Sequence, residues 1–215
     1  VYGSAILPRT VFYTGIDAST KFYRNFDVSS NFLGMDINGL RHVITPTVKY
    51  AYNHTPTILS SKLKQIDTID AIGLNNGVSL ELSNKLQTKR KDQVVTLADV
   101  RVTSGYTFYQ VDPTTNGKSG GDFNDFLVDM ELCPYSWLRV DADATYDNPE
   151  GYFSTANYSF NFDIAKERSI GFGQRYLRKG TNELTASLAW RLTPKWKFSM
   201  YQRYNIGHDP AVKRG

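Results

Sequence analysis

The residues that could carry acid–base, nucleophilic or metal chemistry are few in this chain, and their spacing does not bring them together. Its three histidines are His42, His54 and His208, and its single cysteine is Cys133. A serine hydrolase needs a serine, a histidine and an orienting acid that converge in space, and no spacing here indicates such a set. We therefore predict that the protein is not an enzyme and has no catalytic residue.

Cofactor and metal sites are also weakly indicated. The run Gly117–Gly121 (GKSGG) lacks the strand-to-helix context of a phosphate-binding loop, so we expect a flexible outer loop there. No spacing of histidine and cysteine matches a zinc site. Asp67 and Asp70 could contact a divalent cation, but plain solvation is the expected state. The sequence thus predicts neither a cofactor nor a bound metal.

One cluster of basic residues stands out, Lys85–Lys91 (KLQTKRK). Cations near the rim of a membrane protein could attract phosphorylated lipid or an acidic neighbour, whereas a charged turn would stay in water, and we favour the turn. The whole chain has 25 Lys and Arg against 21 Asp and Glu, a net charge of +4. Acids on the same side of the strands would repel phosphates, so we expect no nucleic-acid partner. These acids are Glu81, Asp99, Asp141, Asp143 and Asp163.

Alternation of apolar and polar residues is the main pattern of the elements that must position these side chains. From Leu138 to Asp147 the even positions are Leu, Val, Ala, Ala and Tyr, and the odd positions are mostly charged. A period of two is typical of an antiparallel strand with one apolar and one wet side. About eleven strands and no helix are expected. They are Thr10–Ala18, Phe22–Ser29, Arg41–Asn53, Val78–Leu86, Leu97–Val111, Asn124–Leu132, Leu138–Asp147, Tyr152–Ile164, Ser169–Leu177, Glu183–Leu192 and Lys195–Ile206.

Composition narrows the class of protein. The 215 residues are 40% hydrophobic and 13% aromatic, yet the mean hydropathy is −0.41, so the apolar content lies in large rings. The longest uncharged stretches are dotted with Ser, Thr and Asn and fall short of the roughly 18 apolar residues of a spanning helix. One cysteine, no Gly-X-Y period and no sustained heptad exclude disulfide scaffolds, collagen and coiled coils.

Strand length and aromatic placement favour a membrane barrel. Several runs are about 10 residues long, against roughly 5–6 for a usual strand and roughly 9–11 for a tilted strand that crosses a bilayer. Aromatic residues recur near the ends of the apolar side, as in the interfacial girdles of outer-membrane barrels. The residues predicted to face lipid or to form a girdle are Tyr50, Tyr52, Trp137, Tyr146, Tyr152, Trp190, Trp196 and Tyr204.

The opposite side of the strands carries charges of both signs, which would need water if they were enclosed. The polar residues predicted to face a water-filled lumen are Arg41, Lys49, Glu81, Lys85, Asp99, Arg101, Arg139, Asp141, Asp143, Asp163, Arg175, Glu183, Arg191, Lys197 and Arg203. The predicted fold class is therefore all-β, an incomplete antiparallel transmembrane β-barrel with about eleven strands of a larger outer-membrane barrel. A soluble sandwich or a secreted β-solenoid, with the aromatic side as its core, is the alternative. Pro46 removes a ladder donor and implies a bulge or kink in either fold.

Specific phrases resemble a known family. They are GLRHVITPTVKYAYNHTPT (Gly39–Thr57) and QIDTIDAIGLNNGVSLELSNKLQTKR (Gln65–Arg90), and CPYSWLRVDADATYDNPEG follows the same rhythm. Over about Phe22–Ile206 the chain resembles the C-terminal barrel portion of the lipopolysaccharide-assembly outer-membrane protein LptD, the organic solvent tolerance protein family. The residues that carry the resemblance are Arg41, Pro46, Tyr50, Tyr52, Leu82, Asn84, Leu86, Gln87, Thr88, Lys89 and Arg90.

The resemblance implies a function. Members of this family form a very large barrel in the bacterial outer membrane, through which lipopolysaccharide passes to the outer leaflet. The implied partners are lipopolysaccharide, the outer-membrane bilayer, a plug lipoprotein and periplasmic bridge proteins. Residues 1–215 are expected to form part of one barrel domain without a second domain, and the missing initiator Met suggests an excerpt. The alternative functions are a passive, porin-like outer-membrane channel or other barrel, and a β-sheet adhesion module.

Overall fold

The structure is a computed structural model that describes residues 9–58, 74–91, 93–112 and 117–208, and it is built almost entirely of antiparallel strands. Asp67 and Asp70 lie outside the described residues. The elements in chain order are β1 (Tyr13–Ser19), β2 (Phe22–Ser30), a 3₁₀ turn η1 (Phe32–Gly34), β3 (Ile37–Asn53), β4 (Asn75–Arg90), β5 (Gln93–Val111), β6 (Lys118–Ser119), β7 (Asp122–Phe123), β8 (Phe126–Tyr135), β9 (Leu138–Asp147), β10 (Tyr152–Ala165), β11 (Arg168–Leu177), β12 (Thr181–Thr193) and β13 (Trp196–His208).

The chain divides into two compact units, and each is described by itself. Unit 1 comprises Val1–Ser19, Thr47–Leu80 and Ser104–Asn124, and unit 2 comprises Thr20–Pro46, Glu81–Thr103 and Asp125–Gly215. Strands β3, β4 and β5 therefore each have one part in unit 1 and one part in unit 2. The prediction of a single barrel domain stays a prediction.

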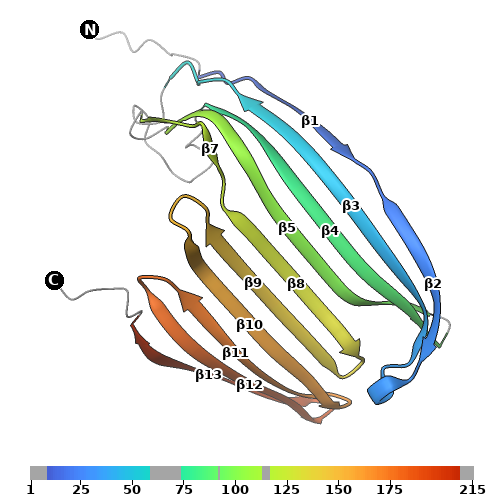
Figure 1. Cartoon of the computed structure of the whole chain (residues 1–215). Helices are drawn as coiled ribbons and strands as arrows, with labels where there is room; N and C mark the ends of the chain where they lie inside the picture. Colours follow the sequence, from blue (N-terminus) through green and yellow to red (C-terminus); the bar gives the residue numbers. More distant parts are fainter. Residues whose placement is uncertain (1–8, 59–73, 92, 113–116, 209–215) are drawn as a thin grey trace. The chain divides into compact units, whose positions relative to one another are not determined.

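Unit 2 holds most of the sheet. Its strands β8 to β13 follow one another in sequence order, each hydrogen-bonded antiparallel to the next, as Figure 1 shows. Short turns join them, and Glu167 and Lys179 adopt positive φ angles of 70° and 58° in two of these turns. Such up-and-down connectivity needs only local turns, because antiparallel neighbours begin where their predecessors end.

Pairing of β3 changes along its length. The register with β2 ends at the pair Phe22 and Ile44, and the register with β1 begins at Ser19 and Thr47. Pro46 lies between these stretches, where the missing N–H of proline costs no bond to either strand. Its carbonyl still accepts a hydrogen bond from the backbone N–H of Thr20 at 3.3 Å.

A β-bulge overturns one predicted side-chain position. The register of β9 and β10 shifts between Phe153 and Thr155, so that Phe153 pairs with Tyr146 and Tyr152 pairs with Asp147. The rings of Tyr146 and Phe153 meet edge to face at 5.3 Å. The extra residue reverses the alternation, and Tyr152 lies on the side that carries Asp147. Its predicted place on the apolar side is wrong.

In unit 1, β1 pairs with the second half of β3, and Asp17 lies opposite Lys49. The stretch Gly117–Gly121, predicted as a flexible outer loop, contains the short strand β6, and the short strand β7 follows it. Both pair with the end of β5. Asn124, directly after β7, fixes this segment to β5. Its N–H donates to the Gly105 carbonyl at 2.9 Å, and its side-chain oxygen accepts from the Thr107 hydroxyl at 2.7 Å. Two residues per strand are too few to show a period of two in the sequence.

Few apolar side chains are buried. Among the described residues these are Val43, Leu97 and Val111. Many large apolar side chains are exposed instead, for example Phe172 at 54% and Met200 at 52%. No described helix is long and apolar enough to cross a membrane. The predicted all-β antiparallel class is confirmed, with eleven longer strands where eleven were expected and two further short ones.

Candidate functional site

Strand register gathers the polar residues of unit 2 on one side of the sheet. Three rows of directly opposed residues cross it, and we call the side they form the polar face. The first row is Asp99, Glu131, Asp141, Ser159, Gly173, Thr185 and Arg203; the second is Arg101, Asp129, Asp143, Asn157, Arg175, Glu183 and Asn205; the third is Arg139, Asn161, Gly171, Ser187 and Tyr201.

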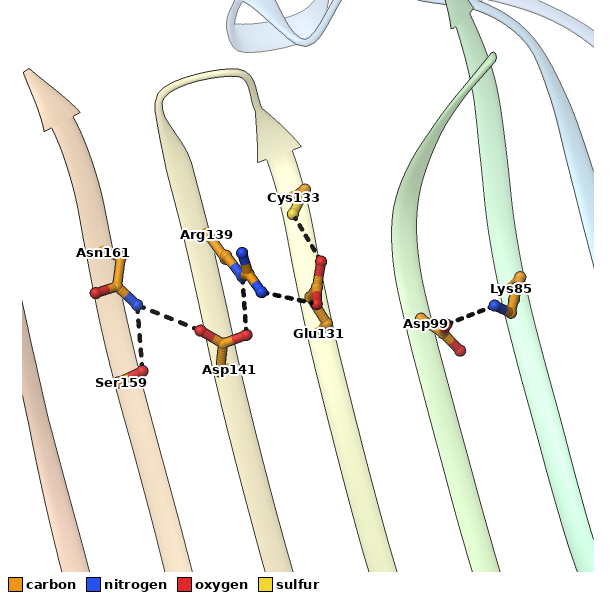
Figure 2. A network of polar contacts seen from close by, with 8 residues as sticks. All are labelled: Lys85, Asp99, Glu131, Cys133, Arg139, Asp141, Ser159 and Asn161. Atoms are coloured by element: carbon orange, nitrogen blue, oxygen red, sulfur yellow. Dashed lines mark hydrogen bonds and ion pairs between the residues drawn. The ribbon is translucent and has the colours of Figure 1, made fainter. Parts of the chain in front are cut away.

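A connected network of ion pairs and hydrogen bonds occupies β8, β9 and β10 on this face (Figure 2). The Arg139 guanidinium bridges two acids, with Nη2 at 3.2 Å from Glu131 Oε2 and Nε at 3.0 Å from Asp141 Oδ1. Asn161 donates from Nδ2 to Asp141 Oδ2 at 3.3 Å. Glu131 and Asp141 are directly opposed, and like charges in that position repel. Arg139 offsets this repulsion by lying between them.

Further ion pairs continue the pattern along the polar face. Lys85 Nζ lies 2.8 Å from Asp99 Oδ2, and Arg101 Nε lies 3.6 Å from Glu81 Oε1. The side chain of Lys85 is 42% exposed, and pairs as exposed as this one contribute only about 0–1 kcal/mol to stability. Arg203 pairs with Glu183 at 3.3 Å, and Arg191 pairs with Glu167 at 3.0 Å. The face therefore offers water a mixed set of charges that partly neutralise one another.

Beyond the charged strands, β10 to β12 present a neutral stretch of the same face. The residues there are small or amide-bearing: Asn157, Ser159, Asn161, Gly171, Gly173, Thr185 and Ser187. All of them except Gly173 line a groove of about 410 Å³, together with Asp141, Asp143, Arg175 and Tyr201 and with Tyr158, Phe172 and Gln174. Small-molecule sites are roughly 300–1,000 Å³. This groove is large enough for a small polar group.

The structure gives the basic run Lys85–Lys91 a packing role at two positions. Besides the pair of Lys85 with Asp99, the Arg90 guanidinium donates to the Met35 carbonyl at 3.1 and 2.7 Å and to the Pro134 carbonyl. Arg90 thereby ties the segment before β3 to the end of β8. The stretch is more than a charged turn in water.

Thr88, also from the phrase that resembles a known family, completes the backbone of β3. Its hydroxyl accepts from the Asn38 N–H at 3.0 Å and donates to the Gly39 carbonyl at 2.8 Å. Gly39 has a φ of +67° beside a register shift between β2 and β3. The side chain of Thr88, only 3% exposed, thus bonds backbone groups at this irregularity.

The polar residues predicted from the sequence lie as follows. Strand register and ion pairs place the predicted polar residues of β4, β5 and β8–β13 on the polar face; Arg41, together with Glu81 and Lys85, lines a hollow of about 370 Å³. Lys49 belongs to unit 1. Lumen exposure of this face remains a prediction, as does lipid exposure of the opposite face.

The opposite, apolar face carries the predicted aromatic residues of unit 2 other than Tyr152. Trp190 pairs with Phe198, and Leu184 pairs with Tyr204. Trp137, in the turn after β8, stacks on Tyr135 at 4.8 Å. The apolar face also carries a series of side-chain hydrogen bonds that strand parity did not predict. Tyr158 donates to Gln174 at 2.7 Å, and Gln174 donates to Asn182 at 2.6 Å. These groups satisfy one another, which lowers the cost of placing them among apolar side chains.

Sequence reasoning also missed Tyr201. It is directly opposed to Ser187 on the polar face and is 56% exposed. The signal was present, because Tyr201 has the same parity as Ser199 and Arg203 on its strand. An aromatic ring among polar residues breaks the separation into two faces.

No catalytic constellation is visible in the part of the chain that the structure describes. His42 lies within β3 opposite Arg24, and His54 Nδ1 lies 2.7 Å from the Thr55 carbonyl oxygen. No group of three or more His, Cys, Asp or Glu among the described residues could hold a metal ion.

Comparison with known proteins supplies the family. The family model described as LptD, LPS transport system D, matches residues 7–196, which include every strand from β1 to β12. No curated protein matches the chain. Because the match covers most of the chain and the sheet is antiparallel with one polar and one apolar face, the chain belongs to the LptD family, the outer-membrane β-barrel component of lipopolysaccharide transport.

Proposed function

We propose that this protein translocates lipopolysaccharide to the outer leaflet of the bacterial outer membrane, with the polar face toward a water-filled lumen and the apolar face toward lipid. One observation supports the proposal most directly. In a chain of the LptD family, three rows of opposed residues, nearly all polar apart from two glycines, cross one side of the same strands that expose large apolar side chains on the other.

The chemistry of the two faces suits an amphipathic cargo. Sugars and phosphates of lipopolysaccharide are strongly hydrated, and they would move along a surface that carries both signs of charge together with amides and hydroxyls. Acyl chains would remain near the hydrocarbon. Because Arg139, Lys85 and Arg101 are already paired with acids, the charged part of the face would solvate the cargo without holding it.

The proposal includes partners and excludes catalysis. The partners would be lipopolysaccharide, the bilayer, a plug lipoprotein of the same machinery and periplasmic bridge proteins. The protein would act as a transporter without chemistry of its own, and the energy for transport would come from upstream.

Depletion of the protein in growing cells tests this function. Lipopolysaccharide at the cell surface, measured by antibody binding to whole cells, should fall. Lipopolysaccharide should accumulate on the periplasmic side of the outer membrane. The amount of an unrelated folded porin should stay unchanged in the same cells. Unchanged surface lipopolysaccharide after full depletion would contradict the proposal.

A passive channel is the second candidate, because a polar face of mixed charge would also line a water-filled pore. Purified protein in a planar bilayer separates the two functions. A channel should conduct ions steadily on its own, and its depletion should leave surface lipopolysaccharide unaltered.

A further inference from the structure

The polar face changes character across unit 2, and the change points to a ligand. On β5, β8 and β9 the opposed residues are mostly charged, whereas on β10, β11 and β12 the first and third rows hold Ser159, Gly173 and Thr185, and Asn161, Gly171 and Ser187. None of these six residues carries a charge, and two of them are glycines. We infer that the groove on this neutral stretch is a binding site for an uncharged saccharide segment, with Tyr201 as its aromatic platform. This inference rests on the proposed translocation of lipopolysaccharide and assigns one part of the cargo to one part of the face.

Of the two glycines on this stretch of β11, Gly171 lines the groove and Gly173 lies beside it, opposite Ser159 and Thr185. An added Cβ at Gly171 would come within 2.5 Å of Ser187 Oγ and 2.8 Å of Asn161 Oδ1. The hydroxyl and the amide of the flanking strands thus converge over a residue with no side chain. An added Cβ at Gly173 would lie 3.0 Å from Thr185 Oγ1. Donors and acceptors from three strands are therefore gathered in one small area.

The groups in the groove are partly oriented and partly free. Asn157 Nδ2 donates to Asp143 Oδ2 at 2.8 Å, and Asn161 Nδ2 donates to Asp141 Oδ2 at 3.3 Å, so carboxylates hold both amides in place. The hydroxyls of Thr185 and Ser187 make no hydrogen bond to any other described residue. A hydroxyl is both a donor and an acceptor, and a saccharide presents the same kind of group at short intervals.

Tyr201 supplies the apolar contact that a sugar ring needs. It lies at the end of the third row, opposite Ser187, and its hydroxyl is 3.5 Å from Arg203 Nη2. A tyrosine ring offers a flat apolar surface with one polar end, and Tyr201 is 56% exposed on a face whose side chains are mostly polar. An exposed ring beside free hydroxyls and oriented amides is suited to the C–H side of a pyranose.

The charges around the groove select against phosphate. Its charged lining residues are Asp141, Asp143 and Arg175, and Arg175 lies directly opposite Glu183 on β12. Two carboxylates against one guanidinium with an acidic neighbour would repel a phosphate group. The neutral sugars of the cargo, rather than its phosphorylated part, are the expected occupants.

Binding of a lipid-free, dephosphorylated core oligosaccharide to the intact protein in detergent micelles tests the inference. Saturation-transfer difference NMR and titration calorimetry should detect binding to the wild type, and an excess of inorganic phosphate should not compete. Tyr201→Ala should weaken binding by about tenfold, equivalent to about 1.4 kcal/mol. Tyr201→Phe should retain affinity, and Tyr204→Ala, on the opposite face of the same strand, should bind like the wild type.

Three results would overturn the inference: no binding to the wild type, equal binding by the wild type and Tyr201→Ala, or complete competition by inorganic phosphate. Surface lipopolysaccharide is measured separately in cells that depend on each variant. Normal surface lipopolysaccharide in the wild type without oligosaccharide binding would reject this site and leave the proposed translocation standing. A failure of the depletion experiment would reject translocation whatever the oligosaccharide does.

Discussion

At the scale of single residues, two side chains of the segment Leu82–Arg90, which carries the resemblance to the family, form hydrogen bonds with backbone groups of other segments. Thr88 bonds both Asn38 and Gly39, and Arg90 bonds the carbonyls of Met35 and Pro134. A planar guanidinium can reach two acceptors in one geometry, which a lysine ammonium cannot reproduce. These side chains therefore stabilise the irregular places of unit 2.

Replacing Arg90 should expose this role. Arg90→Ala should lower the free energy of unfolding by about 2 kcal/mol, since hydrogen bonds to charged groups contribute roughly 1.5–3 kcal/mol. Arg90→Lys should lose most of the same stability although it keeps the charge. Urea unfolding of the protein in phospholipid vesicles, followed by tryptophan fluorescence, measures both. The exposed Lys89→Ala serves as control, and a loss of stability for Lys89→Ala equal to that for Arg90→Ala would refute the argument.

Two glycines of β11 should respond differently to the same added methyl group. In Gly173→Ala the Cβ would lie 2.6 Å from the Tyr158 backbone oxygen. In Gly171→Ala its close contacts would be with the side chains of Ser187 and Asn161, and the nearest backbone atom, the Phe160 oxygen, would lie at 3.6 Å. Side chains can turn away and backbone cannot, so Gly173→Ala should cost roughly 1–3 kcal/mol and Gly171→Ala less than about 1 kcal/mol. The same unfolding measurement compares them. A larger loss for Gly171→Ala would show that β11 is not spaced as described.

At the scale of elements, each strand of unit 2 from β8 to β13 has a polar face and an apolar face. On β12, Leu188 lies opposite Ile170 and Met200 on the apolar face, and the next residue, Ala189, lies opposite Ser169 and Ser199 on the polar face. One step along the chain therefore changes the surroundings completely. In a barrel wall this step separates lipid from water.

An arginine placed on either side of this step tests which face meets lipid. Leu188→Arg should destabilise the protein by about 2–4 kcal/mol if the side chain meets the middle of the bilayer. Ala189→Arg should change stability by no more than about 0.5–1 kcal/mol, as is usual for a solvated position. Both are measured by equilibrium unfolding in vesicles. Equal costs for the two variants would mean that the assigned faces are wrong.

At the scale of the whole molecule, strands β8 to β13 lie in the sheet in the same order as in the sequence. β5 pairs directly with β8, and the short strands β6 and β7 lie between them in the sequence only. β5 pairs with β8 over Ala98–Thr103 and with β6 and β7 beyond it. One long strand thus serves a neighbour in each unit. Its pairing with β8 begins two of the three polar rows of unit 2, at Asp99 and at Arg101.

Disulfide formation should report this pairing in the assembled protein. Val102 and Val128 are directly opposed, so the double variant Val102→Cys, Val128→Cys should cross-link under mild oxidation, since paired residues lie within the roughly 4.4–6.8 Å Cα separation that a disulfide spans. Cys133 is replaced by Ser in all variants. The matched pair Val102→Cys, Leu127→Cys has its side chains on opposite faces and should stay reduced. Cross-linking of this second pair alone would indicate a register shifted by one residue.

The sequence by itself determined the class of fold and most of the faces. A period of two assigns each side chain to a face wherever the ladder is regular, and so Asp141, Arg139 and Leu188 could be placed without coordinates. The same parity places Tyr201 on the polar face. That this ring lies beside Ser187 and Gly171 at a groove became known only from the structure. The family phrase Leu82–Arg90 was recognisable as a string of letters before its contacts were known.

Only the tertiary structure decided what depends on register and on partners distant in the chain. Alternation carries no record of an inserted residue, so the bulge before Thr155, which moved Tyr152 to the other face, could not be read from it. Nor does alternation say which residues stand opposite one another. It could not show that Arg139 bridges Glu131 and Asp141, or that Gly171 lies between the side chains of Asn161 and Ser187. Strand periodicity is a local property of the backbone, whereas sites arise from pairing between strands, and pairing is determined by the whole sheet.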